Sequence, residues 1–133
     1  MPEIKRGRHS VYAINYHLVW ILKCRKKILT GEIERRCEEL LRRLCAEKGW
    51  MVISLKVMPD HVHLSLSVQP SIPVSRIVQT LKRKTATALF RGFPELRSVL
   101  RRGHLWAPSY YAGSTGNVSA EAIQRYIENT QRL

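Results

Sequence analysis

The chain has 133 residues, and its 23 Lys and Arg against 10 Asp and Glu give a formal net charge of +13. This length predicts one domain, residues 1–133, with a core that needs no disulfide or metal for stability. The charge predicts a polyanionic partner: nucleic acid first, or an anionic membrane surface. No apolar run is long enough to span a membrane, and the N-terminus lacks a signal-peptide stretch, so we expect a cytoplasmic protein.

The cysteines exclude two further classes. Cys24, Cys37 and Cys45 are odd in number and have no CxxC spacing. They therefore indicate neither a disulfide framework nor a zinc site. We expect Cys37 and Cys45 to pack within a helix.

The first half of the chain predicts a strand, a helix and a strand. Residues 10–22 are rich in β-branched and aromatic residues and predict a strand, which a basic loop follows at 23–27. Apolar residues at three-to-four spacing predict an amphipathic helix over 30–48 that ends at Gly49. Residues 50–58 predict the second strand.

Residues 61–68 alternate polar and apolar side chains without a break. Successive side chains of a strand point to opposite faces, so the apolar residues face a core while His61 and His63 share the other face. Pro59-Asp60 predicts a tight turn, and hence an antiparallel hairpin with residues 50–58. The imidazoles start roughly 7 Å apart along the strand, close enough to converge on one small ion. Two half-exposed histidines on a polar face remain the alternative.

The second half predicts a helix, a strand and a last helix. The helix covers 75–90 and is stopped by Gly92-Phe93-Pro94. A basic connector at 98–103 leads to a strand at 109–114. The last helix is expected to be capped by Asn117 or Ser119 and to run to about Gln131.

The predicted order is β-α-β-β-α-β followed by a helix. This order is typical of the α+β ferredoxin-like (RRM-like) fold, an antiparallel sheet with two helices on one face. The other face is then open for a ligand. RNA-recognition modules stack bases on sheet aromatics there. Here the positions hold His61 and His63, and imidazole binds metal far better than it stacks, which favours chemistry.

The last helix carries Tyr126 on the border of the apolar face that Ile123 and Ile127 form. One interpretation is a packing residue with its hydroxyl at the rim. The other is a nucleophile toward a phosphodiester, which needs something to polarise the phosphate. A divalent cation held by two histidines on a facing strand would do so.

Four segments carry a family resemblance. They are NYHLVW, VMPDHVHL with its His61-Val62-His63 motif, SYYAGSTGNVS and RYIENTQ, in this order over residues 9–131. In them the chain resembles the single-tyrosine HUH transposases of small insertion sequences. The resemblance implies that His61, His63 and a polar side chain of the tyrosine helix hold Mg²⁺ or Mn²⁺. It also implies a homodimer that recognises DNA hairpins at element ends and cleaves single-stranded DNA, with Tyr126 forming a 5′-phosphotyrosine linkage.

The third metal ligand is where the chain departs from the family. The family commonly has a glutamine four residues after the tyrosine, where this chain has Thr130. We predict Gln131, one residue later, as the ligand, with Thr130, Asn129 or a water as alternatives.

Basic residues are expected to hold the phosphate backbone of the DNA, although a solvated surface is the usual role of such runs. The candidates are Lys23, Arg25, Lys26, Lys27, Lys82, Arg83, Lys84, Arg101 and Arg102. Asp60 is predicted to form the turn and to orient a histidine rather than to bind metal. His17 and His104 are expected to be structural, and Trp106 either packs the sheet or stacks bases.

Competing functions stay open. Relaxases usually add a third histidine, and replication proteins often have a lysine soon after the tyrosine; IENTQ provides neither. A domesticated HUH endonuclease acting on genomic hairpin repeats would keep the same residues. A non-enzymatic ferredoxin-like nucleic-acid-binding module would lose only binding when His61, His63 and Tyr126 are replaced.

Overall fold

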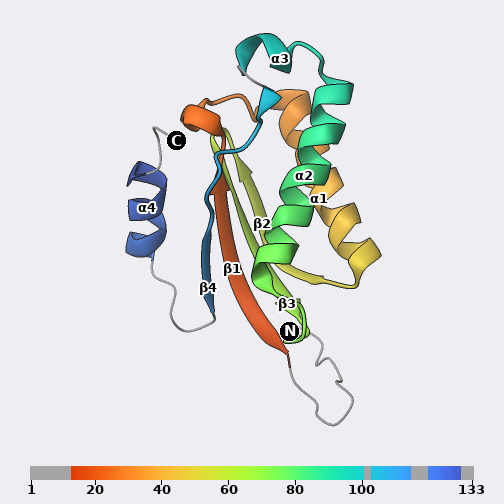
Figure 1. Cartoon of the computed structure of the whole chain (residues 1–133), viewed down its shortest axis with the longest axis vertical. Helices are drawn as coiled ribbons and strands as arrows, with labels where there is room; N and C mark the ends of the chain where they lie inside the picture. Colours follow the sequence, from red (N-terminus) through yellow and green to blue (C-terminus); the bar gives the residue numbers. More distant parts are fainter. Residues whose placement is uncertain (1–12, 101–102, 115–119, 130–133) are drawn as a thin grey trace.

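The computed structural model describes residues 13–100, 103–114 and 120–129 (Figure 1). Four strands form one antiparallel sheet in the order β2-β3-β1-β4: β1 (Ile14–Ile21), β2 (Met51–Met58), β3 (His61–Val68) and β4 (Tyr111–Ser114). The helices are α1 (Gly31–Lys48), α2 (Val74–Gly92), α3 (Leu96–Val99) and α4 (Ala120–Asn129), with a 3₁₀ turn η1 (Lys23–Arg25) after β1. The predicted α+β order is confirmed.

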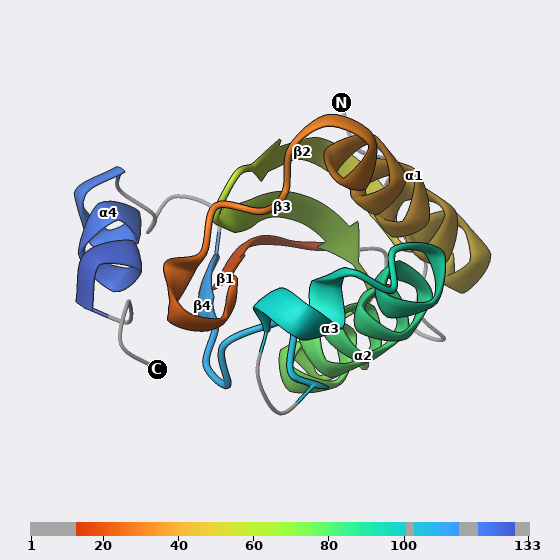
Figure 2. The same ribbon diagram turned by 90° about the horizontal axis from the view of Figure 1, so that it is seen from above.

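Helices α1 and α2 cover one face of the sheet, and α4 lies on the other side (Figure 2). The alternation in β3 explains this layering. Val62, Leu64, Leu66 and Val68 are all 0% exposed and pack with Trp20 of β1 under the two helices. This confirms that the apolar residues of β3 face the main core.

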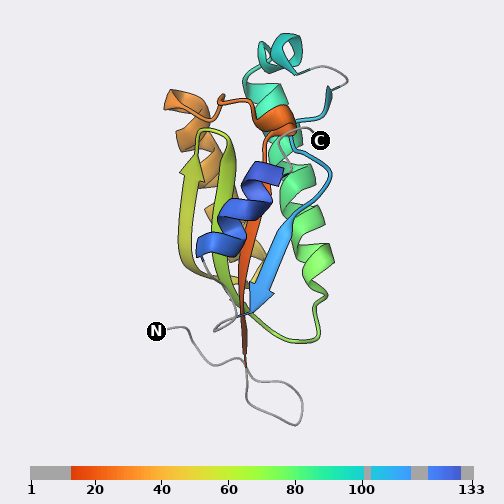
Figure 3. The ribbon, with the colours of Figure 1, turned by 90° about the vertical axis from the view of Figure 1, so that its left-hand side faces the viewer.

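The second face is less open than predicted. Val19, Ile21, Ala107 and Ile127 form a separate buried cluster on it. Ile127 belongs to α4, which lies across the sheet in front of β1 (Figure 3). The amphipathic last helix therefore covers part of the sheet face that was predicted to be open for a ligand.

Several boundaries differ from the prediction; β1, for example, begins at Ile14 and ends at Ile21 rather than spanning 10–22. Helix α2 continues to Gly92, and the N–H of Phe93 still donates to the carbonyl of Leu89. The connector predicted at 98–103 is preceded and partly replaced by the short helix α3. Strand β4 begins at Tyr111 rather than at residue 109, because the chain first meets β1 in another register, with the N–H of Ala107 donating to the carbonyl of Ile21.

The predicted caps Asn117 and Ser119 and the helix end at Gln131 lie outside the described residues. Within the described ranges, no helix is both long and apolar enough to cross a membrane.

The three thiols lie in contrasting environments, which predicts selective labelling. Burial raises the pKa of Cys37 and of Cys45 to about 12, whereas Cys24 is exposed in η1. Because the thiolate is the reacting form, we expect a disulfide reagent at neutral pH to modify Cys24 alone in the folded protein and all three thiols after denaturation. Absorbance of the released chromophore measures this. Rapid reaction of a folded Cys24→Ser variant would contradict it.

Candidate active site

Strand register brings the two histidines to the face that α4 covers. His63 of β3 lies opposite Val19 of β1 and Lys56 of β2, and His61 lies opposite Ile21. Directly opposed residues of an antiparallel pair share a face. Val19 and Ile21 contribute to the cluster under α4, so His61 and His63 face the same side.

Asp60 orients His61. The Nδ1 atom of His61 lies 2.8 Å from Oδ1 of Asp60, and Nε of Arg25 donates to Oδ2 of Asp60 at 3.1 Å. Burial raises the pKa of Asp60, but the hydrogen bonds and charges of His61 and Arg25 outweigh it and hold the pKa below its ordinary value of 3.8. A carboxylate on one imidazole nitrogen is the usual support of a metal-binding histidine, because it fixes the ring and leaves Nε2 for the ion. The structure thus confirms Asp60 as the histidine partner.

Arg25 reaches Asp60 from an unusual backbone. Cys24 and Arg25 have φ values of 59° and 51°, in the left-handed region that residues with a side chain rarely adopt. Two such residues in succession are unfavourable unless tertiary contacts hold them. The ion pair with Asp60 provides one such contact, so η1 belongs to the support of His61. This backbone conformation is not predictable from the sequence, because the turn contains no glycine.

His63 carries an unsatisfied nitrogen. Its Nε2 is buried and has no hydrogen-bond partner among the residues that the structure describes. Burial, then the neighbouring His17, His61 and Lys56, lower its pKa below the ordinary 6.5. The lowered pKa favours the neutral form of His63, which is the form that binds metal, and an Nε2 without a hydrogen-bond partner is compatible with a ligand of a cation.

His17 also belongs to this neighbourhood, which the sequence analysis did not predict. Its ring centroid lies 5.9 Å from that of His63, and its Nδ1 lies 3.0 Å from Oγ of Ser65. No three His, Cys, Asp or Glu side chains in the described ranges form a metal-binding group. A third protein ligand must be another residue type or lie elsewhere, and the predicted ligand Gln131 is outside the described residues.

Tyr126 is half-buried on the same face. Its ring centroid lies 6.2 Å from that of Tyr111, and its hydroxyl oxygen lies 3.0 Å from Oγ of Ser109. The predicted packing role is therefore present. The nucleophilic role needs a hydroxyl near the face that carries His61 and His63, and α4 places Tyr126 on that face.

The predicted DNA-binding residues occupy different settings. Lys26, Lys27, Arg83 and Lys84 are exposed. Arg83 and Lys84 border a groove of about 400 Å³ between α1 and α2, which Arg43 and Arg91 also line. Lys82 instead donates to two backbone carbonyls, and Arg101 and Arg102 lie outside the described residues. DNA contact by this set stays a prediction.

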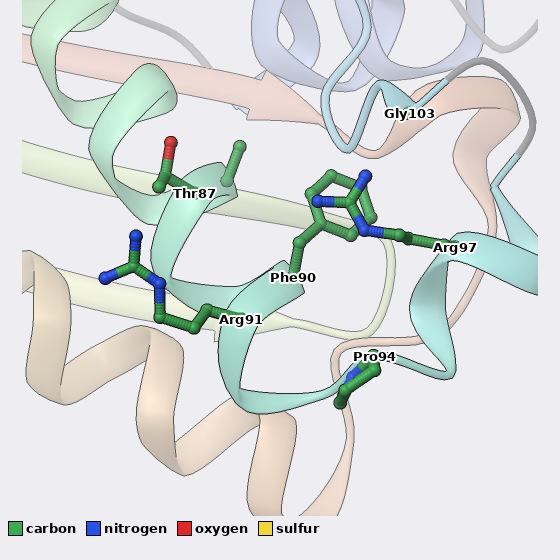
Figure 4. A pocket seen from close by; sticks show the side chains of 7 residues that line it. Thr87, Phe90, Arg91, Pro94, Arg97 and Gly103 are labelled. Carbon is green, nitrogen blue, oxygen red and sulfur yellow. The ribbon is translucent and has the colours of Figure 1, made fainter.

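A second basic pocket lies where α2 meets α3 (Figure 4). Its volume is about 500 Å³, and Phe90, Arg91, Pro94 and Arg97 line it. The guanidinium of Arg97 lies 4.7 Å from the centre of the Phe90 ring, a cation–π contact. Arg97 was not among the predicted binding residues, because the contact depends on the turn between the two helices. Trp106, by contrast, packs in the core and donates from Nε1 to Oγ1 of Thr85.

Replacing Asp60 by asparagine should weaken the support of His61 in a pH-dependent way. The low pKa means that near pH 4 the folded protein binds fewer protons than the unfolded chain, so Asp60 stabilises the fold above its ordinary pKa and loses this effect as the pH falls below it. We expect Asp60→Asn to lower unfolding free energy at pH 7 and much less at pH 3. Urea titrations at both pH values measure it. A deficit that is constant with pH would contradict this origin.

The described parts combine into an α+β protein whose sheet carries packing helices on one face and, on the other, a histidine pair and a tyrosine helix. Residues 10–130 match the family model described as "Transposase IS200 like". The chain belongs to this family of IS200-like transposases, enzymes that act on DNA.

Individual relatives agree with this assignment. The ISDra2 transposase TnpA of Deinococcus radiodurans is 40% identical over 127 residues, covering 96% of this chain and 91% of that protein. The transposase for insertion sequence element IS200 of Salmonella typhimurium is 30% identical over 129 residues, covering 97% and 84%. A solved structure of a candidate transposase from Deinococcus radiodurans R1 matches with a TM-score of 0.89, 36% identity and coverage of 96% and 98%.

A more distant structure matches in fold alone. The REP-associated tyrosine transposase bound to a REP hairpin has a TM-score of 0.58 and 14% identity, covering 98% of this chain and 68% of that one. The α+β fold with its antiparallel sheet is thus common to both.

Proposed function

We propose that the protein is a metal-dependent transposase that cleaves and rejoins single-stranded DNA at insertion-sequence ends through a 5′-phosphotyrosine intermediate. One observation carries the proposal: the buried Nε2 of His63, without a partner among the described residues, lies on the same face as His61 and Tyr126. An unpaired imidazole beside a second, carboxylate-supported imidazole favours a cation, and a cation beside a tyrosine favours phosphoryl transfer.

His61 and His63 would hold Mg²⁺ or Mn²⁺, with Gln131 as the third ligand, or with Thr130, Asn129 or water in its place. Such hard ions readily accept oxygen ligands and water. When bound, the ion would neutralise charge on the scissile phosphate. Asp60 would hold the His61 ring in the ligating orientation through its 2.8 Å hydrogen bond.

Tyr126 would then carry the covalent step. Its hydroxyl oxygen forms a bond to phosphorus while the bond from phosphorus to the 3′ oxygen breaks, which leaves a free 3′-hydroxyl and the 5′ phosphate on Tyr126. The phenol proton is lost to solvent and the leaving 3′ oxygen gains one. Attack of a 3′-hydroxyl on the phosphotyrosine reverses the exchange and joins strands, so the phosphodiester energy is conserved without a nucleotide cofactor.

The DNA partner follows from charge and shape. The groove between α1 and α2 is lined by four cations, Arg43, Arg83, Lys84 and Arg91, and by one carboxylate, Glu47, so its net charge is positive and suits a phosphate backbone. Hairpin recognition at element ends is part of the proposal, in keeping with the hairpin bound to the distantly similar REP-associated transposase. We also propose the homodimer that the family resemblance implies.

The test is covalent capture. Single-stranded DNA bearing the element's end hairpin and flank is incubated with protein and Mn²⁺ or Mg²⁺, and a denaturing gel detects the protein–DNA adduct. We expect a metal-dependent adduct that Tyr126→Phe abolishes. Tyr111→Phe is the matched control, because the Tyr111 ring packs against Tyr126 yet has no role in the step, and it should retain the adduct.

Three outcomes would contradict the proposal. An adduct in Tyr126→Phe would exclude this nucleophile. Tight hairpin binding by folded protein without any adduct would instead support the non-enzymatic binding module. Adduct formation on genomic repeat hairpins but not on element ends would indicate the domesticated endonuclease.

A further inference from the structure

The hydroxyl of Tyr126 is held by a residue outside regular structure. Its oxygen lies 3.0 Å from Oγ of Ser109, which belongs to the segment 107–110 between the core residue Trp106 and β4. The tyrosine ring is placed separately, by packing against Tyr111 and the cluster under α4. The phenol oxygen is rigidly attached to the ring, so ring packing already sets its approximate position, and the hydrogen bond to Ser109 adds a directional contact at the oxygen itself.

The segment that bears Ser109 is tied to α2 from the opposite side of the sheet. Nζ of Lys82 donates to the carbonyl of Ala107 at 2.6 Å and to that of Ser109 at 3.2 Å. One turn further along α2, Oγ1 of Thr85 accepts from Nε1 of Trp106 at 3.0 Å. Burial lowers the pKa of Lys82 to about 8, which leaves its ammonium largely protonated and able to donate at neutral pH. Bonds to a charged donor are stronger than neutral ones, so Lys82 is the principal tie.

A serine suits this position chemically. Its hydroxyl can accept a hydrogen bond from the phenol and can donate one to the phenolate that develops during attack. Ser109 can therefore hydrogen-bond to the oxygen of Tyr126 both before and during the covalent step. This matters because a small displacement of a reacting atom lowers the reaction rate.

We propose that Ser109 is a positioning residue for the Tyr126 hydroxyl and that Lys82 acts through Ser109 by fixing its backbone. The inference rests on the proposed nucleophilic role of Tyr126. It adds two residues to the machinery, one of them on the helix-covered side of the sheet.

The first test is the single-turnover rate of adduct formation with the hairpin substrate. Ser109→Ala should lower this rate about 3- to 10-fold, the effect of one lost hydrogen bond, with the hairpin dissociation constant unchanged. Ser109→Thr keeps the hydroxyl and should restore the rate. An unchanged rate in Ser109→Ala, or a loss of hairpin binding equal to the loss of rate, would overturn the inference.

The second test asks whether Lys82 acts through Ser109. Lys82→Met keeps most of the side-chain length and removes both donor bonds, so it should slow the adduct in the same direction. The double variant with Ser109→Ala should be no slower than the more affected single variant, because both changes remove the same positioning. If the double variant instead lost rate by the product of the two single-variant factors, Lys82 would not act through Ser109. No adduct with wild-type protein would overturn the proposed function and this inference together, whereas an adduct that Ser109→Ala leaves unaltered would overturn the inference alone.

Discussion

Replacing His63 by leucine should abolish the metal-dependent adduct and, at the same time, make the metal-free protein more stable. The reason is the buried Nε2, which has no partner in the described part of the chain. A buried polar atom without a hydrogen bond costs free energy, and an apolar side chain of similar size removes that cost. We expect the free energy of unfolding to rise by about 1 kcal/mol, while metal affinity falls because only His61 remains of the pair.

The two effects are measured separately, by urea unfolding without metal and by calorimetric titration with Mn²⁺. His104→Leu is the control, because His104 is an exposed histidine that does not belong to β3, and it should alter neither quantity. If His63→Leu bound Mn²⁺ as tightly as the wild type, the proposed ligand would be wrong. If it unfolded more readily, the unsatisfied Nε2 would not be the destabilising group described above.

The largest loss of stability is expected from Trp20→Ala. Trp20 is 0% exposed and meets the Trp106 ring edge-on with centroids 6.0 Å apart. Truncating a buried tryptophan removes its apolar burial and leaves a cavity, which costs about 3–5 kcal/mol. The protein is of a size for which this is a large part of the total stability.

Trp20→Phe separates packing from polarity. Nε1 of Trp20 has no partner among the described residues, so phenylalanine loses no hydrogen bond and should cost about half as much or less. Urea titrations of both variants provide the comparison. Equal losses of unfolding free energy in the two variants would mean that the indole N–H makes a stabilising hydrogen bond. A small loss in Trp20→Ala would mean that neighbouring side chains move in to fill the cavity.

The alternation and spacing of apolar residues predicted much of the fold, but only part of the candidate active site. Alternation in β3 predicted the faces of Val62 and His63 because the period of a strand is a property of consecutive residues. It could not place His17 beside His63, since that contact depends on the register between β1 and β3, and the bond from His17 to Ser65 joins positions 48 apart. The polar–apolar pattern around His17 is visible in the sequence, but its partner strand and offset are not.

Lys82 illustrates the same limit. In the sequence it is one of three consecutive cations and predicts a solvated or phosphate-binding side chain. In the fold its neighbours Arg83 and Lys84 are exposed, while Lys82 turns toward the carbonyls of Ala107 and Ser109. Helical periodicity points consecutive side chains about 100° apart around the helix axis. It does not predict which of the three side chains meets Ala107, which lies 25 residues further along the chain than Lys82.

The two apolar clusters give the molecule uneven local stability. The cluster under α1 and α2 gathers residues from all three long strands, whereas α4 rests on a small one whose buried members among the described residues are Val19, Ile21, Ala107 and Ile127. Segments with few buried contacts open at lower free energy than the whole domain. Amides of α4 should therefore exchange with solvent hydrogen well before those of β1 and β3. On the proposed function, the helix that carries Tyr126 would then leave the sheet and return with a DNA end attached while the domain beneath it stays folded.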